Sequence, residues 1–153
     1  MLLFMQISLV HVGAAAASKD ACDHLVHTYL ERCSQFARCS IQSFRTEKAM
    51  LEWLRRQSGR MPVLTVMLDS RGRTMSSEAF ASWLGARRDE GAQHLVFAIG
   101  PASGWSNEAQ VQAKLLLSFG PMTLAHALAR LVMAEQIYRA VTILTGHPYH
   151  CGH

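Results

Sequence analysis

Several residue patterns that mark well-known functions are missing from this sequence of 153 residues. The four cysteines contain no C-x-x-C pair, so neither a zinc ribbon nor a dithiol redox pair is indicated, and reduced thiols in a cytoplasmic protein are expected. The dinucleotide-binding G-x-G-x-x-G pattern, the G-x-S-x-G elbow of serine hydrolases and the phosphate-binding loop are also absent. No apolar run reaches the roughly 18 residues of a membrane span, so no membrane partner is expected.

Charge is sparse as well, at 17% of the residues, while half of the residues are hydrophobic. This composition is typical of a compact α/β domain and argues against disorder. The length fits one domain, residues 1–153. Basic residues exceed acidic ones by 15 to 11, and 12 of them are arginine. Arginine can contact phosphates and stack on bases, so the composition is compatible with RNA binding without establishing it.

The amino terminus allows two interpretations. Residues 1–12 are mostly apolar, and the small residues that follow resemble a signal-peptide cleavage site. However, no basic residue precedes the apolar run, and Gln6, Ser8 and His11 interrupt it. A buried first strand that ends at Gly13 is therefore the favoured prediction, with secretion as the alternative.

Short apolar runs alternate with longer helical patterns along the chain. Strands are predicted near residues 5–12, 40–44, 63–68, 94–99 and 115–119. Helices are predicted to begin at Ser18, Thr46, Ser76 and Ser106 or Asn107, and a long last helix is predicted to stop at Gly146. On the first helix, Leu25 is placed on the inward face, and on the last helix Leu124 and Leu128 are placed there. Strict alternation favours a parallel sheet with helices on both faces.

Three loops follow predicted strands and carry residues suited to ligand binding. They comprise residues 68–73, 97–104 and 119–124. In a parallel sheet such loops meet at one edge, where glycine allows the backbone to approach a ligand. A pocket of backbone groups would suit an uncharged, adenine-like ligand, although ordinary strand-to-helix turns are the alternative.

The histidines give weaker indications. Three of them fall in the tail with Cys151, but a chain end rarely holds a closed four-ligand site, so no metal is expected. His24, His27 and His94 have no visible partner in the sequence. His126 lies in the first turn of the last helix, one turn before Arg130 and beside the last of the three loops. This position is suited to substrate contact, although a structural role is the alternative.

Several of these segments together resemble a known family. The resemblance rests on Leu68-Asp69 with Gly72, Met75-Ser-Ser-Glu78, Phe97-x-Ile-Gly-x-x-x-Gly104, Leu117-Ser-Phe119, Met122-Thr-Leu124, His126, Arg130, Glu135-Gln-x-Tyr-Arg139 and Tyr149-His150. With these motifs the chain resembles the RlmH (YbeA) family, the bacterial large-subunit rRNA pseudouridine N3-methyltransferases of the SPOUT class. The likeness extends over nearly the whole chain and is most specific after Leu64.

The resemblance implies an α/β fold with a C-terminal trefoil knot and an S-adenosylmethionine site, both within about residues 64–153. It implies a cytoplasmic homodimer in which the partner completes each site. The substrate would be N3 of a pseudouridine in a hairpin loop of 23S rRNA in the large ribosomal subunit or the assembled ribosome. Two alternatives stay open: a methyltransferase of another RNA such as tRNA, and a non-catalytic protein of ribosome binding or assembly.

The resemblance also implies roles for individual residues. The expected cofactor-binding positions are Leu68, Gly100, Phe119, Gly120, Pro121, Met122, Thr123 and Leu124. The expected substrate-side, catalytic residues are His126, Arg139, Tyr149 and His150. N3 must lose a proton, which a nearby histidine or a cation would assist. Which residue acts as the base stays open.

The chain departs from the family pattern at three places. Pro101 replaces a second glycine in the loop after the fourth predicted strand, which removes a backbone N–H and fixes φ. The tail ends in Cys151-Gly152-His153 where the family has a Lys or Arg, and Ala14 replaces a frequent lysine. These changes spare the 119–124 loop, to which the resemblance assigns donor binding.

Overall fold

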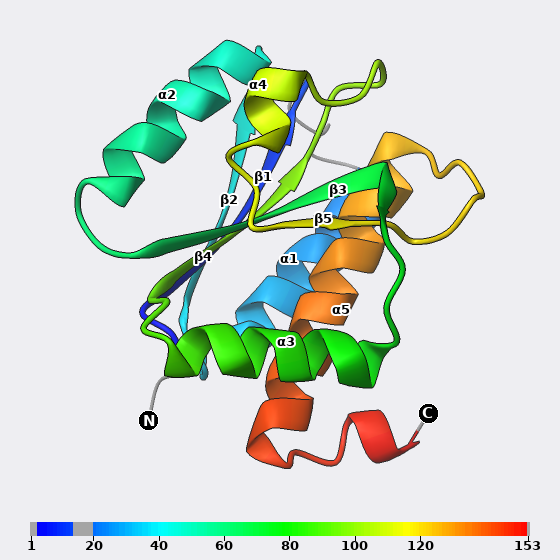
Figure 1. Cartoon of the computed structure of the whole chain (residues 1–153). Helices are drawn as coiled ribbons and strands as arrows, with labels where there is room; N and C mark the ends of the chain where they lie inside the picture. Colours follow the sequence, from blue (N-terminus) through cyan, green and yellow to red (C-terminus); the bar gives the residue numbers. More distant parts are fainter. Residues whose placement is uncertain (1–2, 14–19, 153) are drawn as a thin grey trace.

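A computed structural model of the chain describes residues 3–13 and 20–152. The five predicted strands form one parallel sheet with the order β2-β1-β4-β3-β5 (Figure 1). The strands are β1 (Gln6–Val12), β2 (Arg38–Phe44), β3 (Val63–Arg73), β4 (His94–Ile99) and β5 (Leu115–Leu117). The helices are α1 (Ala21–Cys33), α2 (Glu47–Ser58), α3 (Ser77–Asp89), α4 (Asn107–Gln110) and α5 (His126–Thr145), followed by the 3-10 turn η1 (His150–Gly152). The predicted α/β class is confirmed.

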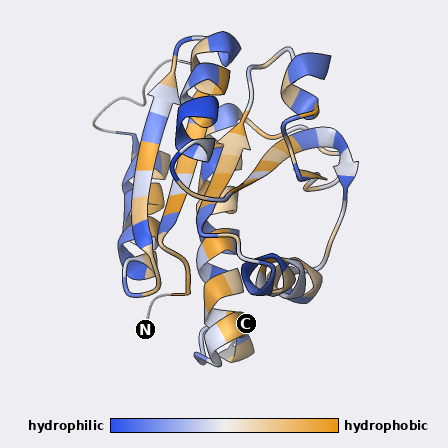
Figure 2. Ribbon diagram, turned by 60° about the vertical axis from the view of Figure 1, so that its left-hand side comes forward, coloured by the Kyte–Doolittle hydropathy of each residue, from blue (hydrophilic) through white to orange (hydrophobic). Residues whose placement is uncertain are grey.

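Helices cover both faces of the sheet, as parallel strands require. On one face, Met50, Leu51 and Leu54 of α2 pack against strand residues such as Met67. On the other face, α1, α3 and α5 enclose a larger core with the opposite side chains of the same strands. β4 is buried along its whole length, and the strands in the middle of the sheet in Figure 2 are mostly in the hydrophobic colour.

The ends of most helices lie where the side chains predict. Thr46, Ser76 and Ser106 each accept a hydrogen bond from the backbone N–H three residues later, so all three predicted N-caps are confirmed. Asp20 caps α1, whereas Ser18 lies outside the described residues. Gly146 ends α5 in the left-handed conformation with φ of 74°.

The inward faces of α1 and α5 differ from the prediction. α1 buries Val26, Leu30 and Cys33, while Leu25 is 44% exposed. On α5, Leu128 is 45% exposed, and Leu124 lies before the helix begins. The prediction was wrong here because the apolar residues of both helices extend beyond the stripe that faces the sheet, and only tertiary packing selects the buried part.

β3 and β5 approach each other unusually closely. β3 leaves the ladder after Leu68 and returns at Arg73, which pairs again with Leu117. Gly72 lies in this excursion, where a Cβ atom would come within 2.8 Å of the Leu117 nitrogen and closer still to the Leu116 carbonyl. Only glycine fits, because the obstructing atoms are backbone. β3 is therefore longer than predicted, and β5 is shorter, with Phe119 in the loop that follows it.

The first strand settles part of the ambiguity at the amino terminus. β1 pairs with both β2 and β4 in the interior of the sheet, and its last six residues are buried. The predicted buried strand is confirmed. In the described ranges 3–13 and 20–152, no helix combines the length and apolar character needed to cross a membrane.

Candidate active site

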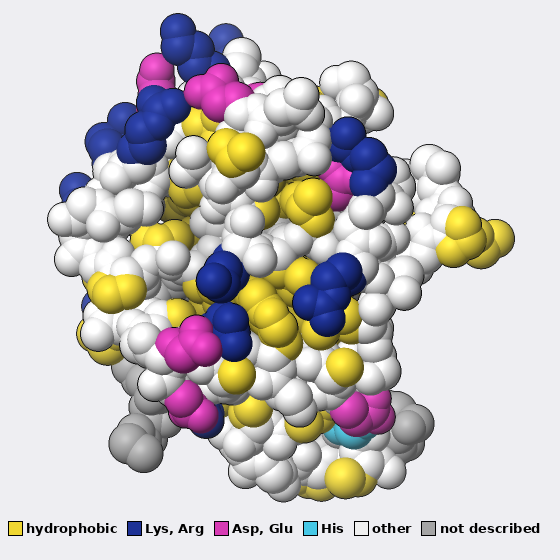
Figure 3. Space-filling view, viewed as in Figure 1, with side chains coloured by type: hydrophobic (Ala, Val, Ile, Leu, Met, Phe, Trp, Pro, Cys, Tyr) yellow, Lys and Arg dark blue, Asp and Glu magenta, His cyan; other side chains and the backbone are white. Residues whose placement is uncertain are grey.

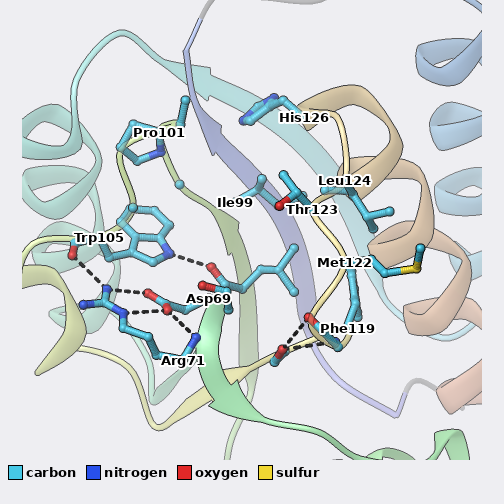
Figure 4. A pocket seen from close by; sticks show the side chains of 18 of the residues that line it. Asp69, Arg71, Ile99, Pro101, Trp105, Phe119, Met122, Thr123, Leu124 and His126 are labelled. Atoms are coloured by element: carbon cyan, nitrogen blue, oxygen red, sulfur yellow. Dashed lines mark hydrogen bonds and ion pairs between the residues drawn. The ribbon is translucent and has the colours of Figure 1, made fainter.

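Residues 68–71, where β3 leaves the ladder, and the loops after β4 and β5 border one cavity of about 520 Å³ (Figure 4). The three segments therefore meet as expected, although the first of them belongs to β3 and is not a loop after it. The cavity is lined by all eight of the expected cofactor-binding residues: Leu68, Gly100, Phe119, Gly120, Pro121, Met122, Thr123 and Leu124. His126 also lines it. The structure brings these nine residues together, while their roles stay predictions.

Trp105 forms one wall of the cavity, and sequence reasoning missed it. Its ring lies against Gly100, where a Cβ atom would be 2.7 Å from the indole. The indole N–H donates a hydrogen bond of 2.9 Å to the Leu68 carbonyl (Figure 4). Trp105 thus ties the loop after β4 to the end of β3. The sequence signal that could have identified Trp105 is the position of a tryptophan in a glycine-containing loop just after a buried strand.

An ion pair fixes the same wall from behind. The Asp69 side chain is buried and accepts two hydrogen bonds from the Arg71 guanidinium, at 2.9 and 2.8 Å, and one from the Arg71 backbone. These hydrogen bonds hold the pKa of Asp69 below its ordinary value, so it is a carboxylate at neutral pH. Arg71 also donates to the Trp105 carbonyl at 3.2 Å. The ion pair therefore connects β3 with the loop after β4.

The remaining lining is mostly backbone and small or apolar side chains. Of the described residues that line the cavity, only Asp69, Arg71 and His126 are titratable, and the first two neutralise each other. Phosphate sites usually offer more unpaired positive charge. Peptide groups beside apolar side chains suit a ligand with an adenine-like edge.

His126 is linked to two buried basic groups. One terminal nitrogen of Arg130 (Nη1) lies 3.2 Å from Nδ1 of His126 and 3.4 Å from Nδ1 of His11. Arginine can only donate hydrogen bonds, so both Nδ1 atoms must accept and both rings carry their proton on Nε2. Nε2 of His126 is buried without a hydrogen-bond partner among the described residues. His126 is therefore arranged as a neutral donor rather than as a ready base.

The electrostatics of this cluster favour neutral rings. Burial and the nearby Arg130 charge lower the pKa of His126. Burial, Arg130 and His126 lower the pKa of His11 to about 4, with Asp23 acting in the opposite direction. Arg130 is buried, and no carboxylate pairs with it in the described part of the chain.

The low pKa of His11 predicts a loss of stability in acid. The unfolded chain binds this proton below about pH 6.5, whereas the folded protein resists it until about pH 4. The contribution is constant above pH 6.5, and the free energy of unfolding should fall by about 2 kcal/mol between pH 7.5 and pH 5. Urea unfolding at both pH values, compared with a His11→Asn variant, measures it. Equal pH dependence in the two proteins would contradict the assignment.

A second polar cluster lies at the other end of α5. Arg139 donates from Nε and Nη2 to Glu135, and its Nη1 lies 3.0 Å from Nδ1 of His150. The guanidinium carbon lies 4.9 Å from the centre of the Tyr149 ring, and the Tyr149 hydroxyl donates to Glu135 at 3.0 Å. Burial, with hydrogen bonds to Tyr29 and Glu135, raises the pKa of Tyr149, which argues against Tyr149 as a base.

Arg139 is nevertheless able to bind a further group. A guanidinium has five N–H bonds, and its three nitrogens each donate once to Glu135 or His150, so two N–H bonds have no partner among residues 3–13 and 20–152. Its side chain is only 14% exposed. A fixed, partly buried cation of this kind suits an anionic or partly negative oxygen or nitrogen.

The structure does not bring this second cluster to the cavity of the same chain. Arg139 follows His126 by 13 residues of α5, which corresponds to about 20 Å along the helix. Arg139, Tyr149 and His150 do not line the cavity. Of the four expected substrate-side residues, only His126 borders it.

His94 differs from the sequence expectation. It is buried, and its Nε2 lies 2.8 Å from the Ser8 hydroxyl, so it has a partner that the sequence did not reveal. Among residues 3–13 and 20–152, no group of three or more His, Cys, Asp or Glu is placed to hold a metal ion.

Comparisons with known proteins agree with this geometry. The chain is 44% identical over 149 residues to the ribosomal RNA large subunit methyltransferase H of Koribacter versatilis, covering 97% of this chain and all of the relative. It is 38% identical over 160 residues to the protein of the same name from Methylocella silvestris, covering 95% and 99%. A probable methylase family protein of known structure from Haemophilus influenzae shares the fold, with a TM-score of 0.54, 9% identity, and 97% and 71% coverage. A family model described as a predicted SPOUT methyltransferase matches residues 5–150. The chain belongs to this SPOUT methyltransferase family.

Proposed function

We propose that this protein methylates N3 of a pseudouridine in 23S rRNA of the large ribosomal subunit, with S-adenosylmethionine as methyl donor. The observation that carries the proposal is the 520 Å³ cavity, in which β3 and the loops after β4 and β5 bring together every expected donor-binding residue. The names of the relatives, ribosomal RNA large subunit methyltransferase H, support the choice of substrate.

The cavity fits the donor by its size and by the kind of groups that line it. Leu68, Ile99 and Phe119 offer apolar contacts, and the glycine-containing loops offer peptide groups. Gly100 and Gly120 have no side chain to fill the space, and Gly120 adopts a φ of 111°. When bound, S-adenosylmethionine supplies an electrophilic methyl group on a sulfonium. The protein's task is to hold the acceptor in line with it.

Gly100→Ala is expected to weaken donor binding. The new methyl group collides with Trp105, which must move into the cavity and lose its hydrogen bond to Leu68. We expect the dissociation constant for S-adenosylmethionine to rise at least about tenfold and stability to fall by about 1–3 kcal/mol. Calorimetric titration measures the dissociation constant. Gly59→Ala is the control, because a Cβ atom at Gly59 would have its nearest contact at 3.5 Å. Unchanged affinity in Gly100→Ala would contradict the placement of the donor.

The acceptor nitrogen must lose its proton during the reaction. Neither ring nitrogen of His126 is a free acceptor, because Nδ1 accepts from Arg130 and Nε2 carries the proton. Arg139 has a fixed positive charge and two N–H bonds without a partner in the described part of the chain. We assign to Arg139 the stabilisation of negative charge that develops on the pyrimidine as the N3 proton leaves for solvent.

A homodimer is part of the proposal, because the cavity and Arg139 lie about 20 Å apart in one chain. A second copy running in the opposite direction along α5 would bring its Arg139, Tyr149 and His150 toward the first cavity. Exposed apolar residues support an interface on this side. They are Leu25 of α1, Leu128 of α5, and Met122 and Leu124 of the loop between β5 and α5.

A trefoil knot is also proposed for residues 64–153. The close passage of β5 against the Gly72 backbone is compatible with a chain threaded past an earlier segment. The loop from residue 118 to residue 125 projects from the body of the molecule between β5 and α5 (Figure 1).

The charge distribution of the protein favours an RNA substrate that is itself folded. On the face in Figure 3, the Lys and Arg side chains lie in separate groups rather than in one band. A scattered net charge of +4 gives weak nonspecific attraction to RNA. A ribosomal hairpin loop that completes the site would compensate for this weak attraction. The proposal therefore includes that the protein acts in the cytoplasm, on the assembled ribosome.

The proposal is tested by incubating the purified protein with labelled S-adenosylmethionine and ribosomes that lack the modification. Label is expected in 23S rRNA. Label in tRNA instead would favour a methyltransferase of another RNA. No donor binding at millimolar concentration would favour a non-catalytic assembly protein, for which Pro101 and the Cys151-Gly152-His153 tail are the motivating departures.

A further inference from the structure

Glu78 makes a contact that neither the sequence nor the proposed function assigns. It lies in the first turn of α3, and its carboxylate is 2.9 Å from Nε2 of His150. The other nitrogen of the same ring, Nδ1, is 3.0 Å from Nη1 of Arg139. One imidazole therefore connects an acidic residue of α3 with the cation of α5.

The identity of the two partners fixes the tautomer of His150. The guanidinium of Arg139 can only donate, so Nδ1 of His150 must be the acceptor and must be unprotonated. A neutral ring then carries its proton on Nε2, where the Glu78 carboxylate accepts it. Glu78 is itself a carboxylate at neutral pH, because the α3 backbone and His150 hold its pKa below the ordinary value.

We propose that Glu78 is a positioning residue that acts through His150: it holds the ring in the Nε2–H form so that Nδ1 fixes the guanidinium of Arg139. Both ring nitrogens are then occupied, so His150 braces Arg139 and does not take the proton from N3. The inference rests on the proposed function for its catalytic consequence, but the tautomer follows from the contacts alone.

Alternative roles for Glu78 predict different behaviour. As a helix-dipole partner in the first turn of α3, it would contribute to stability only, and His150 would be irrelevant to its effect. As an RNA-facing carboxylate, it would alter the KM for ribosomes. As a positioning residue, it changes kcat, and its effect disappears when His150 is removed.

Nitrogen NMR of histidine-labelled protein tests the tautomer without any activity measurement. The His150 signals are assigned by their loss in His150→Ala. In the wild type we expect a protonated Nε2 and an unprotonated Nδ1. In Glu78→Ala the ring should exchange between tautomers or protonate differently, whereas Glu52→Ala, an exposed carboxylate on α2, should leave it unchanged. A wild-type His150 with its proton on Nδ1, or no change in Glu78→Ala, would overturn the proposal.

Methyl-transfer kinetics test the consequence. Glu78→Ala is expected to lower kcat about tenfold with unchanged KM for the donor, and Glu78→Gln, which keeps an acceptor oxygen, should recover most of it. In a His150→Ala background, Glu78→Ala should cause no further loss. An equal loss in both backgrounds, or a loss confined to KM, would contradict the positioning role. If the wild type transfers no methyl group at all, the proposed function fails while the NMR result still decides the tautomer.

Discussion

Arg139→Ala is expected to lower the rate of methyl transfer by about two to three orders of magnitude, with donor binding unchanged. Arg139 is held by Glu135, His150 and the Tyr149 ring, and two of its N–H bonds remain for the substrate. Arg139→Lys should recover little, because an ammonium cannot keep the hydrogen bonds to both Glu135 and His150 in one plane. Single-turnover kinetics with ribosomes, with Arg88→Ala on α3 as control, measure the effect. An unchanged rate of methyl transfer in Arg139→Ala would show that Arg139 takes no part in the reaction.

The same variant tests whether the site is shared between two chains. When Arg139→Ala chains are mixed with Gly100→Ala chains, a mixed dimer has one intact cavity facing one intact Arg139 if the partner supplies it. At a donor concentration well below the raised dissociation constant of Gly100→Ala, an equal mixture should then recover about a quarter of the wild-type activity, because half of the dimers have one of two sites restored. If Arg139 serves the cavity of its own chain, no mixed dimer has an intact site and mixing restores nothing.

Gly72→Ala is expected to lower the free energy of unfolding by about 3 kcal/mol or more. Its methyl group would overlap the backbone of Leu116 and Leu117 in β5, which no side-chain rotation can relieve. The two strands would have to separate beside the donor cavity, since Leu68 and Leu117 are direct partners. Donor binding should therefore weaken together with stability.

Urea unfolding with Gly59→Ala as the matched control measures this effect. Gly59 adopts a φ of −74° at the end of α2, a conformation that alanine also adopts, so this change should be neutral or slightly stabilising. A Gly72→Ala protein that unfolds within about 0.5 kcal/mol of the wild type would show that the backbones of β3 and β5 are not in direct contact at Gly72.

Local signals predicted most of the fold. Thr46, Ser76 and Ser106 begin helices because each hydroxyl can satisfy a free backbone N–H within three residues, which needs no knowledge of the rest of the chain. β4 was placed correctly because six consecutive residues, mostly apolar and bounded by turn residues, admit few alternatives. The carboxyl-end rule then placed the three loops together at one cavity.

Long-range packing was beyond the sequence. The inward face of α1 was misplaced at Leu25 because several apolar residues compete and only the position of the sheet decides among them. The hydrogen bond from the Trp105 indole to the Leu68 carbonyl, and the contact of His11 with Arg130, join residues that are far apart in the sequence, and no local pattern predicts such pairs. The direct contact of Glu78 with His150 spans 72 residues and depends on how α3 packs beside the tail.

The substrate-side residues show the same difference between local signals, which the sequence reveals, and long-range packing, which it does not. Glu135 and Arg139 of the motif Glu135-Gln-x-Tyr-Arg139 form an ion pair, since residues four apart on a helix are neighbours. The motif could not show that this pair lies about 20 Å from His126 along α5. That separation is what makes the partner chain part of the proposed site.

The proposed methylation is most directly tested by mass spectrometry of 23S rRNA from a strain in which the gene for this protein has been deleted and then restored. We expect that one N3-methylpseudouridine is absent in the deletion strain, returns with the wild-type gene, and does not return with the Arg139→Ala gene. An unchanged level of N3-methylpseudouridine in the deletion strain would contradict the proposed function.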